Sequence, residues 1–132
     1  MKLDNELSER EVKMFSPLQL AYIGDAVYEV YVRKYLLLNT KVKVNGLHKE
    51  AIKFVKAKAQ ANAVRVIKET LTEEEWRVVK RGRNAKSSTV PKNANINDYK
   101  YATGFEALIG YLHLTNKDVR IKELFDIIIK DN

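Results

Sequence analysis

The chain has 132 residues, a formal net charge of +7 and no cysteine. This length allows one hydrophobic core, so the sequence predicts a single domain over residues 1–132, with its core between about 15 and 130. The lack of cysteine excludes disulfides and thiolate metal sites. The charged N-terminus has no signal-peptide core, and residues 21–38, the longest apolar stretch, carry charges that a bilayer helix avoids. We therefore expect a cytoplasmic protein that does not bind membranes.

The spacing of apolar residues favours helices along the whole chain. Apolar side chains recur at intervals of three and four, and only two prolines interrupt them, which predicts an all-α fold. Ser16, Pro17 and Gln19 form a helix start with a capping box, so we expect a helix over residues 16–37. This helix is apolar nearly all round, which is typical of a central helix covered by other helices or by a second subunit. Residues 44–70 indicate one long amphipathic helix or two shorter ones.

The second half of the chain predicts three further helices. Thr72 and Glu75 form another capping box, so a helix is expected to start at residue 72. Residues 82–97 are rich in Arg, Asn, Lys, Ser and Thr, which indicates a long loop. Two more periodic apolar segments predict helices over residues 98–114 and 118–130.

Positive charge is concentrated between Glu75 and Asp98, an interval that contains no acidic residue. The candidate RNA-binding residues in this interval are Arg77, Lys80, Arg81, Arg83 and Lys86. Such a patch can grip the phosphates and 2′-hydroxyls of RNA through charge and shape. The same run can also be a solvated face that only improves solubility.

Two acidic residues, Asp25 and Glu106, stand where the helical pattern expects apolar side chains. A carboxylate on an apolar helix needs solvent, a basic partner or a metal ion, because burying its charge alone is costly. Gly24, Gly104 and Gly110 lie inside the same predicted helices and indicate that the helices cross beside the acids. On residue type alone, a structural ion pair or a solvent-facing position is favoured over a metal site.

Glu29 follows Asp25 by one helical turn on the same face, which makes it a candidate third acid of such a site. A salt bridge at the outer rim is an equally good interpretation of Glu29.

The segments around the two acids resemble the signature motifs of the ribonuclease III family. Residues 22–26 (YIGDA) are similar to the end of the first motif, N-E-R-L-E-F-L-G-D-A, and residues 105–110 (FEALIG) to the second, D-x-x-E-A-x-I-G. The resemblance covers residues 15–129 and implies an all-helical catalytic domain that forms a homodimer. It also implies that Asp25 and Glu106 are catalytic and bind Mg²⁺, for which Mn²⁺ is a substitute.

Two positions depart from the family pattern, because Leu18 and Thr103 stand where the family has carboxylates. These departures, the lack of a double-stranded-RNA-binding domain and the segments 19–29, 81–86 and 102–106 resemble the Mini-ribonuclease III branch, a free-standing catalytic domain. The resemblance implies an endoribonuclease that cleaves double-stranded RNA and matures the ends of 23S ribosomal RNA. Its implied partners are this RNA and a second copy of the chain, with ribosomal proteins as further candidates.

Carboxylate-held Mg²⁺ suits phosphodiester hydrolysis, because it activates water at neutral pH and neutralises charge that develops on the phosphate. With only Asp25 and Glu106 as protein ligands, water molecules and substrate phosphates must complete the octahedron around the ion. We therefore expect Mg²⁺ binding to be weak without RNA.

Two other functions stay open at this point. A ribonuclease III fold that has lost catalysis and only binds structured RNA is suggested by Leu18 and Thr103, and duplex cleavage in Mg²⁺ but not in EDTA separates it from an enzyme. A helical DNA-binding regulator is less favoured, because no short turn joins two suitably spaced helices. That interpretation also leaves Asp25 and Glu106 unexplained.

Overall fold

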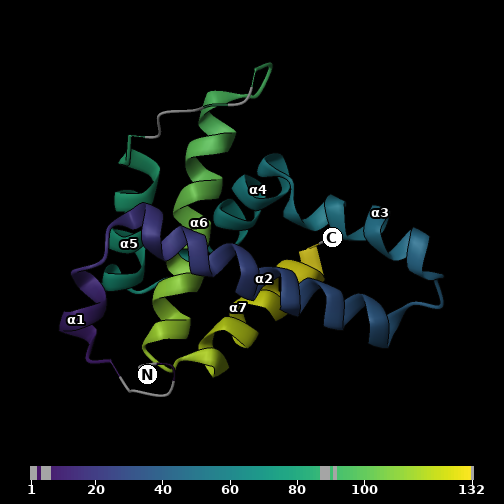
Figure 1. The fold of residues 1–132 in the computed structure, drawn as a ribbon, viewed down its shortest axis with the longest axis horizontal. Coiled ribbons are helices and arrows are strands. Elements are labelled where there is room, and N and C mark those ends of the chain that lie inside the picture. Colours follow the sequence, from purple (N-terminus) through teal and green to yellow (C-terminus); the bar gives the residue numbers. More distant parts are fainter. Residues whose placement is uncertain (1–2, 4–6, 87–89, 91, 132) are drawn as a thin grey trace.

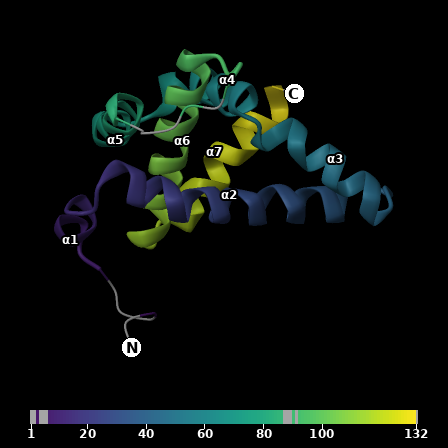
Figure 2. The same ribbon diagram turned by 45° about the horizontal axis from the view of Figure 1, so that its top comes forward.

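The computed structural model describes residues 3, 7–86, 90 and 92–131. Within these residues, seven α-helices and one short 3-10 helix form a bundle without any β-strand, which confirms the predicted all-α fold (Figures 1 and 2). None of the helices in the described residues combines the length and apolarity that crossing a bilayer requires.

The helices lie close to their predicted positions, with one addition. In chain order they are α1 (Glu9–Lys13), α2 (Pro17–Asn39), α3 (Val44–Val55), α4 (Ala57–Ile67), η1 (Lys68–Thr70), α5 (Glu73–Asn84), α6 (Ile96–Leu114) and α7 (Asp118–Asp131). The short helix α1 has no counterpart among the predicted elements. The segment 44–70 forms two α-helices rather than one, because the backbone at Lys56 is extended (φ −63°, ψ 153°).

Local sequence rules explain where the helices begin. The Ser16 side chain accepts a hydrogen bond from the Gln19 backbone at 3.1 Å, and the Gln19 side chain accepts one from the Ser16 backbone at 2.9 Å. Thr72 and Glu75 make the same reciprocal pair at the start of α5, with distances of 3.1 and 2.9 Å. Both predicted capping boxes are therefore present.

The central helix of the bundle is α6, which α2, α4 and α5 cover on different sides (Figure 1). Its buried residues are Ala102, Gly104, Phe105, Ala107, Leu108, Ile109, Gly110, Tyr111 and Leu112. The helix expected over residues 16–37 is α2, which packs against α6 and α3 with its buried side. Its other side leaves large apolar side chains exposed, among them Tyr22, Val30 and Leu37.

Glycines let α2 and α6 touch along their backbones. A Cβ atom on Gly24 would overlap the carbonyl oxygen of Glu106, and one on Gly110 would overlap the carbonyl oxygen of Leu20. Only glycine allows this close approach. The predicted crossing of the two acid-bearing helices is therefore confirmed at Gly24 and Gly110. The third predicted glycine, Gly104, instead lies against Val79 and Arg83 of α5.

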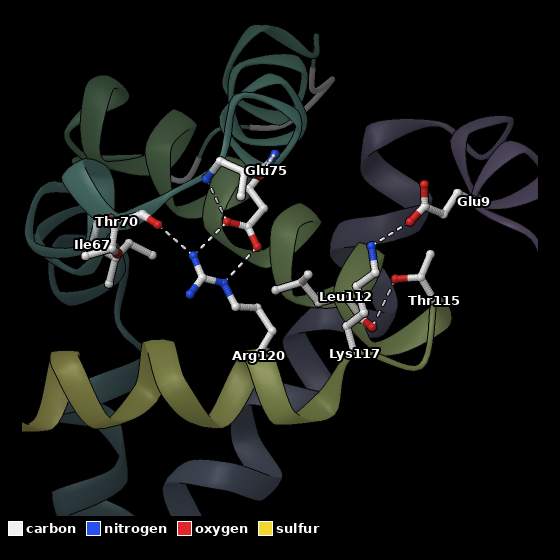
Figure 3. Close-up of polar contacts among 9 residues, drawn as sticks. Glu9, Ile67, Thr70, Glu75, Leu112, Thr115, Lys117 and Arg120 are labelled. Carbon is white, nitrogen blue, oxygen red and sulfur yellow. Dashed lines mark hydrogen bonds and ion pairs between the residues drawn. The ribbon is translucent and has the colours of Figure 1, made fainter.

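Two long-range polar contacts fix the C-terminal part of the fold (Figure 3). Arg120 on α7 donates to the two carboxylate oxygens of Glu75 on α5, each at 2.9 Å, and to the Thr70 carbonyl at 2.7 Å. Lys117 donates to Glu9 on α1 at 2.6 Å. These contacts tie α7 and the segment before it to elements that lie much earlier in the sequence.

Candidate active site

Two crossing helices bring Asp25 and Glu106 together. Asp25 lies on α2 and Glu106 on α6, beside the glycine contacts at which the two helices meet. The two carboxyl groups lie close enough to interact, with Asp25 exposed and Glu106 partly buried. The fold thus places side by side two acids that are far apart in the sequence.

Glu106 lies in surroundings that disfavour its charged form. Burial raises its pKa to about 8, and the hydrogen bond and the charge of Asp25 act in the same direction, while the amide of Gln60 opposes them. Among the described residues, neither acid forms an ion pair with a basic side chain. The structural ion pair that residue type alone favoured therefore finds no partner in this part of the chain. A strongly shifted acid without a structural partner is typical of a functional site.

Glu29 lies one turn further along α2, and its carboxylate already forms a salt bridge. Arg33 donates to its carboxylate at 2.8 Å, which is the rim salt bridge considered for this residue. Within the described ranges, no group of three or more acidic or histidine side chains is arranged to hold a metal ion. Any cation at this place would therefore have two protein carboxylates, Asp25 and Glu106, as its ligands.

Leu18 has no ligating side-chain atom, and the Thr103 hydroxyl is hydrogen-bonded within its own helix. Leu18 is exposed near the start of α2. The Thr103 hydroxyl donates to the Tyr99 carbonyl within α6 at 3.0 Å, so its hydrogen atom is directed back into the helix.

One polar side chain near the acids was missed by the sequence analysis. Gln60 on α4 is buried, and its amide lies against Glu106. The available signal was its position on the helix, because Gln60 shares a face with Val64 and Ile67, both of which belong to the core. An amide on such a face needs a polar partner, as the two acids do.

Two of the five predicted basic residues have partners in the described part of the chain. Arg77 is bound to Glu74 at 3.1 Å, and Arg83 lies over the ring of Tyr101 with 5.6 Å between the guanidinium and the ring centre. The remaining three are Lys80, Arg81 and Lys86, which form no ion pair with any described residue. Arg81 and Lys86 are exposed, whereas Lys80 is partly buried. Part of the predicted 82–97 loop, residues 87–89 and 91, lies outside the described residues.

Comparisons with known proteins identify the family. The sequence model of the ribonuclease III domain family matches residues 18–117 of this chain. The chain is 52% identical to the Mini-ribonuclease 3 of Clostridium tetani, over 96% of this chain and 85% of that protein. It is 42% identical to the Mini-ribonuclease 3 of Staphylococcus aureus, with 96% of each covered. The crystal structure of a Fusobacterium nucleatum protein matches with a TM-score of 0.81 at 36% identity, over 91% of this chain and 96% of that one.

These findings confirm the resemblance seen in the motifs. The matched domain includes both Asp25 and Glu106, and the relatives align over nearly the whole chain. The chain therefore belongs to the ribonuclease III family of endoribonucleases, in the branch of the Mini-ribonuclease 3 proteins.

Proposed function

We propose that the chain is a Mg²⁺-dependent endoribonuclease that hydrolyses phosphodiester bonds in double-stranded RNA. The observation that carries the proposal is the contact between the carboxyl groups of Asp25 and Glu106, neither of which is neutralised by a basic side chain among the described residues. Two adjacent carboxylates repel each other once both are ionised, and a divalent cation relieves this repulsion. Membership of the ribonuclease III family supplies the reaction class.

Asp25 and Glu106 would hold the cation, since carboxylate oxygens are the ligands that Mg²⁺ prefers in proteins. When bound, Mg²⁺ supplies a water of lowered pKa and a positive charge beside the scissile phosphate. Asp25, on the exposed side, is the acid that RNA meets first. Glu106 must lose its proton to become a ligand. Glu29, the candidate third acid, would have to leave Arg33 before it could join them.

The RNA duplex would be gripped by the basic residues of α5 and of the segment that follows it. Arg81 and Lys86 are the best placed of the five candidates, because both are exposed and form no ion pair within the described residues. Arg77, Lys80 and Arg83 complete the proposed contact, but Arg77 and Arg83 already have partners. Contacts of this kind bind phosphates irrespective of base sequence.

We also propose that two chains form a symmetric homodimer through α2. Tyr22, Val30 and Leu37 lie along one side of this helix and are 85%, 63% and 68% exposed. A groove between α2 and α3, lined in part by Leu37, Val44 and Leu47, continues this apolar surface. Exposed apolar surface of this extent is typical of an association site, and two-fold pairing is the commonest arrangement. The acid pair of each chain would then cleave one strand of the duplex.

Light scattering at micromolar concentration tests the dimer. We expect about twice the mass of one chain, as two-fold pairing requires. A monomeric mass would contradict the proposal. Mixing active chains with an excess of Asp25→Asn chains adds a second test, because a mixed dimer is expected to nick one strand of the duplex. Cutting of both strands without any nicked product would contradict the division of strands between the sites.

The physiological substrate that we propose is the precursor of 23S ribosomal RNA in the cytoplasm, with ribosomal proteins as candidate partners. This step rests on the resemblance to the Mini-ribonuclease III branch, to which the chain is similar over most of its length. Depletion of the protein from its host should leave 23S ends unprocessed, as sequencing of those ends would reveal. Normally processed 23S ends after depletion would exclude this RNA as the substrate.

Incubation of the purified chain with a long RNA duplex tests the enzymatic activity directly. We expect cleavage in Mg²⁺ or Mn²⁺ and none in EDTA. Binding of the duplex without cleavage in either metal would instead favour the second candidate function, an inactive module that binds structured RNA. Leu18 and Thr103, which replace family carboxylates, are the observation behind that second candidate.

A further inference from the structure

A buried amide stands beside the acid pair. Gln60 lies on α4, which packs against α6, the helix that carries Glu106. Only 1% of Gln60 is exposed, so its amide is removed from bulk solvent. The amide is close enough to Glu106 to favour the ionised form of that carboxyl group.

The amide nitrogen of Gln60 has no hydrogen-bond partner among the described residues. Leaving a buried donor unpaired costs about 1–3 kcal/mol, and an apolar side chain of similar size would avoid this cost. The neighbouring inward positions of α4, Val64 and Ile67, are apolar and well buried. Gln60 is therefore unfavourable for the metal-free fold alone, and its unpaired donor indicates a state in which a neighbouring acceptor is turned towards it.

Glu106 is an acceptor that already lies beside the Gln60 amide. A carboxylate that binds a cation through one oxygen still has lone pairs on the other oxygen, which need donors in a partly buried site. A lysine or arginine at this place would neutralise Glu106, as Arg120 neutralises Glu75. It would then compete with the cation for the carboxylate. An amide donates a hydrogen bond without adding charge.

We propose that Gln60 is a positioning residue, whose amide donates to the Glu106 carboxylate and holds it turned towards a divalent cation bound with Asp25. Gln60 acts through Glu106 and does not touch the reacting atoms. This role rests on the proposed function, since it requires that the acid pair binds Mg²⁺. Loss of such an outer partner typically lowers metal affinity or activity 10- to 100-fold.

Gln60→Met tests the role, because methionine keeps the approximate shape of the side chain and removes the donor. The matched control is Asn62→Met, since Asn62 is an exposed amide on the same helix. The first readout needs no RNA and is the rise in melting temperature as Mg²⁺ is added. We expect Gln60→Met to need at least about tenfold more Mg²⁺ for half the rise. Its melting temperature without Mg²⁺ should equal or exceed that of the wild type, because an unpaired buried donor is gone.

The second readout is duplex cleavage as a function of Mg²⁺ concentration. The Mg²⁺ concentration that gives half-maximal cleavage should rise for Gln60→Met and stay unchanged for Asn62→Met. Equal Mg²⁺ midpoints for the wild type and Gln60→Met would overturn the role of Gln60 and leave the acid pair standing. No effect of Mg²⁺ on the wild type, in stability or in cleavage, would overturn the metal site and this role together.

A measurement on the wild-type chain covers the case in which Gln60→Met does not fold. The side-chain amide resonances of Gln60 and Asn62 can be followed by NMR while Mg²⁺ is added. We expect the Gln60 resonances to shift and those of Asn62 to stay in place. Gln60 resonances that move no more than those of Asn62 at saturating Mg²⁺ would overturn the proposal.

Discussion

Glu75 and Glu106 are two covered carboxyl groups that the fold treats in opposite ways. Glu75 is 6% exposed and receives two hydrogen bonds from Arg120 and one from the Thr72 backbone (Figure 3). Burial opposes its ionisation, but these hydrogen bonds outweigh burial and hold the pKa of Glu75 below its usual value. Glu106 has a second acid, Asp25, where Glu75 has a guanidinium.

The difference separates an acid that is paired within the chain from the acid that we propose to be part of the active site. The charge of Glu75 is neutralised within the chain, so its pair with Arg120 can join α5 to α7 without any external partner. Glu106 has no basic partner among the described residues. Burial raises the pKa of both residues, whereas the sign of the neighbouring charge accounts for their opposite pKa shifts.

The largest expected effect tests the functional side of this comparison. Asp25→Asn removes a metal-binding charge and keeps the size of the side chain, so duplex cleavage should fall by about 10³-fold or more. Circular dichroism and the melting temperature should stay close to the wild type, because Asp25 is exposed. The control is Asp126→Asn, which removes an exposed acid that pairs with Lys122 at 3.1 Å. Cleavage by Asp25→Asn at the rate of this control would refute the site.

Breaking the Glu75–Arg120 pair should lower the stability of the chain and leave catalysis unchanged. Arg120→Met leaves the Glu75 charge covered and unpaired, so the free energy of unfolding should fall by about 3 kcal/mol. Lys122→Met, which breaks an exposed pair on the same helix, should change it by less than about 0.5 kcal/mol. Urea unfolding measures both, and cleavage per folded molecule should be the same for both. Equal losses in the two variants would mean that the Glu75 pair adds no stability beyond a surface pair.

The two acids should also give opposite pH dependences of stability. The pKa of Glu106 is raised from 4.5 to about 8, so the folded chain holds this proton more tightly than the unfolded chain and loses stability as the pH rises through that window. Glu75, whose pKa is lowered, contributes stability above 4.5 that is lost as the pH falls below it.

Melting temperatures of the wild type and Glu106→Gln, measured in EDTA across this range, isolate the Glu106 contribution. The melting temperature of Glu106→Gln should rise relative to that of the wild type as the pH rises towards about 8. Above this pH the difference between the two should stay constant. A constant difference between the two at all pH values would show that Glu106 ionises normally.

The smallest effect concerns the basic residues. Arg81→Ala combined with Lys86→Ala should weaken RNA binding and lower the slope of log affinity against log salt by about one for each phosphate that the protein no longer neutralises. Arg77→Ala should change the slope less, because Arg77 is already paired with Glu73 and Glu74. Binding measured at several salt concentrations checks both. An unchanged slope for the double variant would return these residues to a role in solubility.

Local rules in the sequence predicted most of the fold. The capping residues Ser16 and Thr72 marked two helix starts, and the glycines marked the crossing of α2 and α6, because each effect depends on nearby residues or on backbone approach. The break at Lys56 could not be decided, since no proline or glycine stands beside it. Which helix is central could not be decided either, because an apolar helix can be covered by its own chain or by another one.

The candidate site was predictable in part. Asp25 and Glu106 stood out as charges on apolar helices, whereas Gln60 did not, since a neutral amide on such a face has many ordinary explanations. Its significance depends on contact with Glu106, which lies on another helix. The partners of the basic residues could not be predicted for a different reason. Side chains on one helix point to different sides, so Arg83 reaches Tyr101 while Arg77 stays with its own acids.

The weak burial of α3 has a consequence for how the fold opens. Of its 12 residues only Ala51 is buried, whereas α6 is covered on most sides, and α3 lies along the outer half of α2 (Figures 1 and 2). Leu47, Phe54 and Val55 of α3 pack against the core only partly buried, so detaching α3 exposes less apolar surface than detaching α6. We therefore expect α3 to open as a separate unit below the free energy of global unfolding. Hydrogen–deuterium exchange should show this as amides of α3 that exchange well before those of α6. The groove beside Leu37 would then exist only while α3 is closed, and a second chain bound there would slow exchange throughout α3.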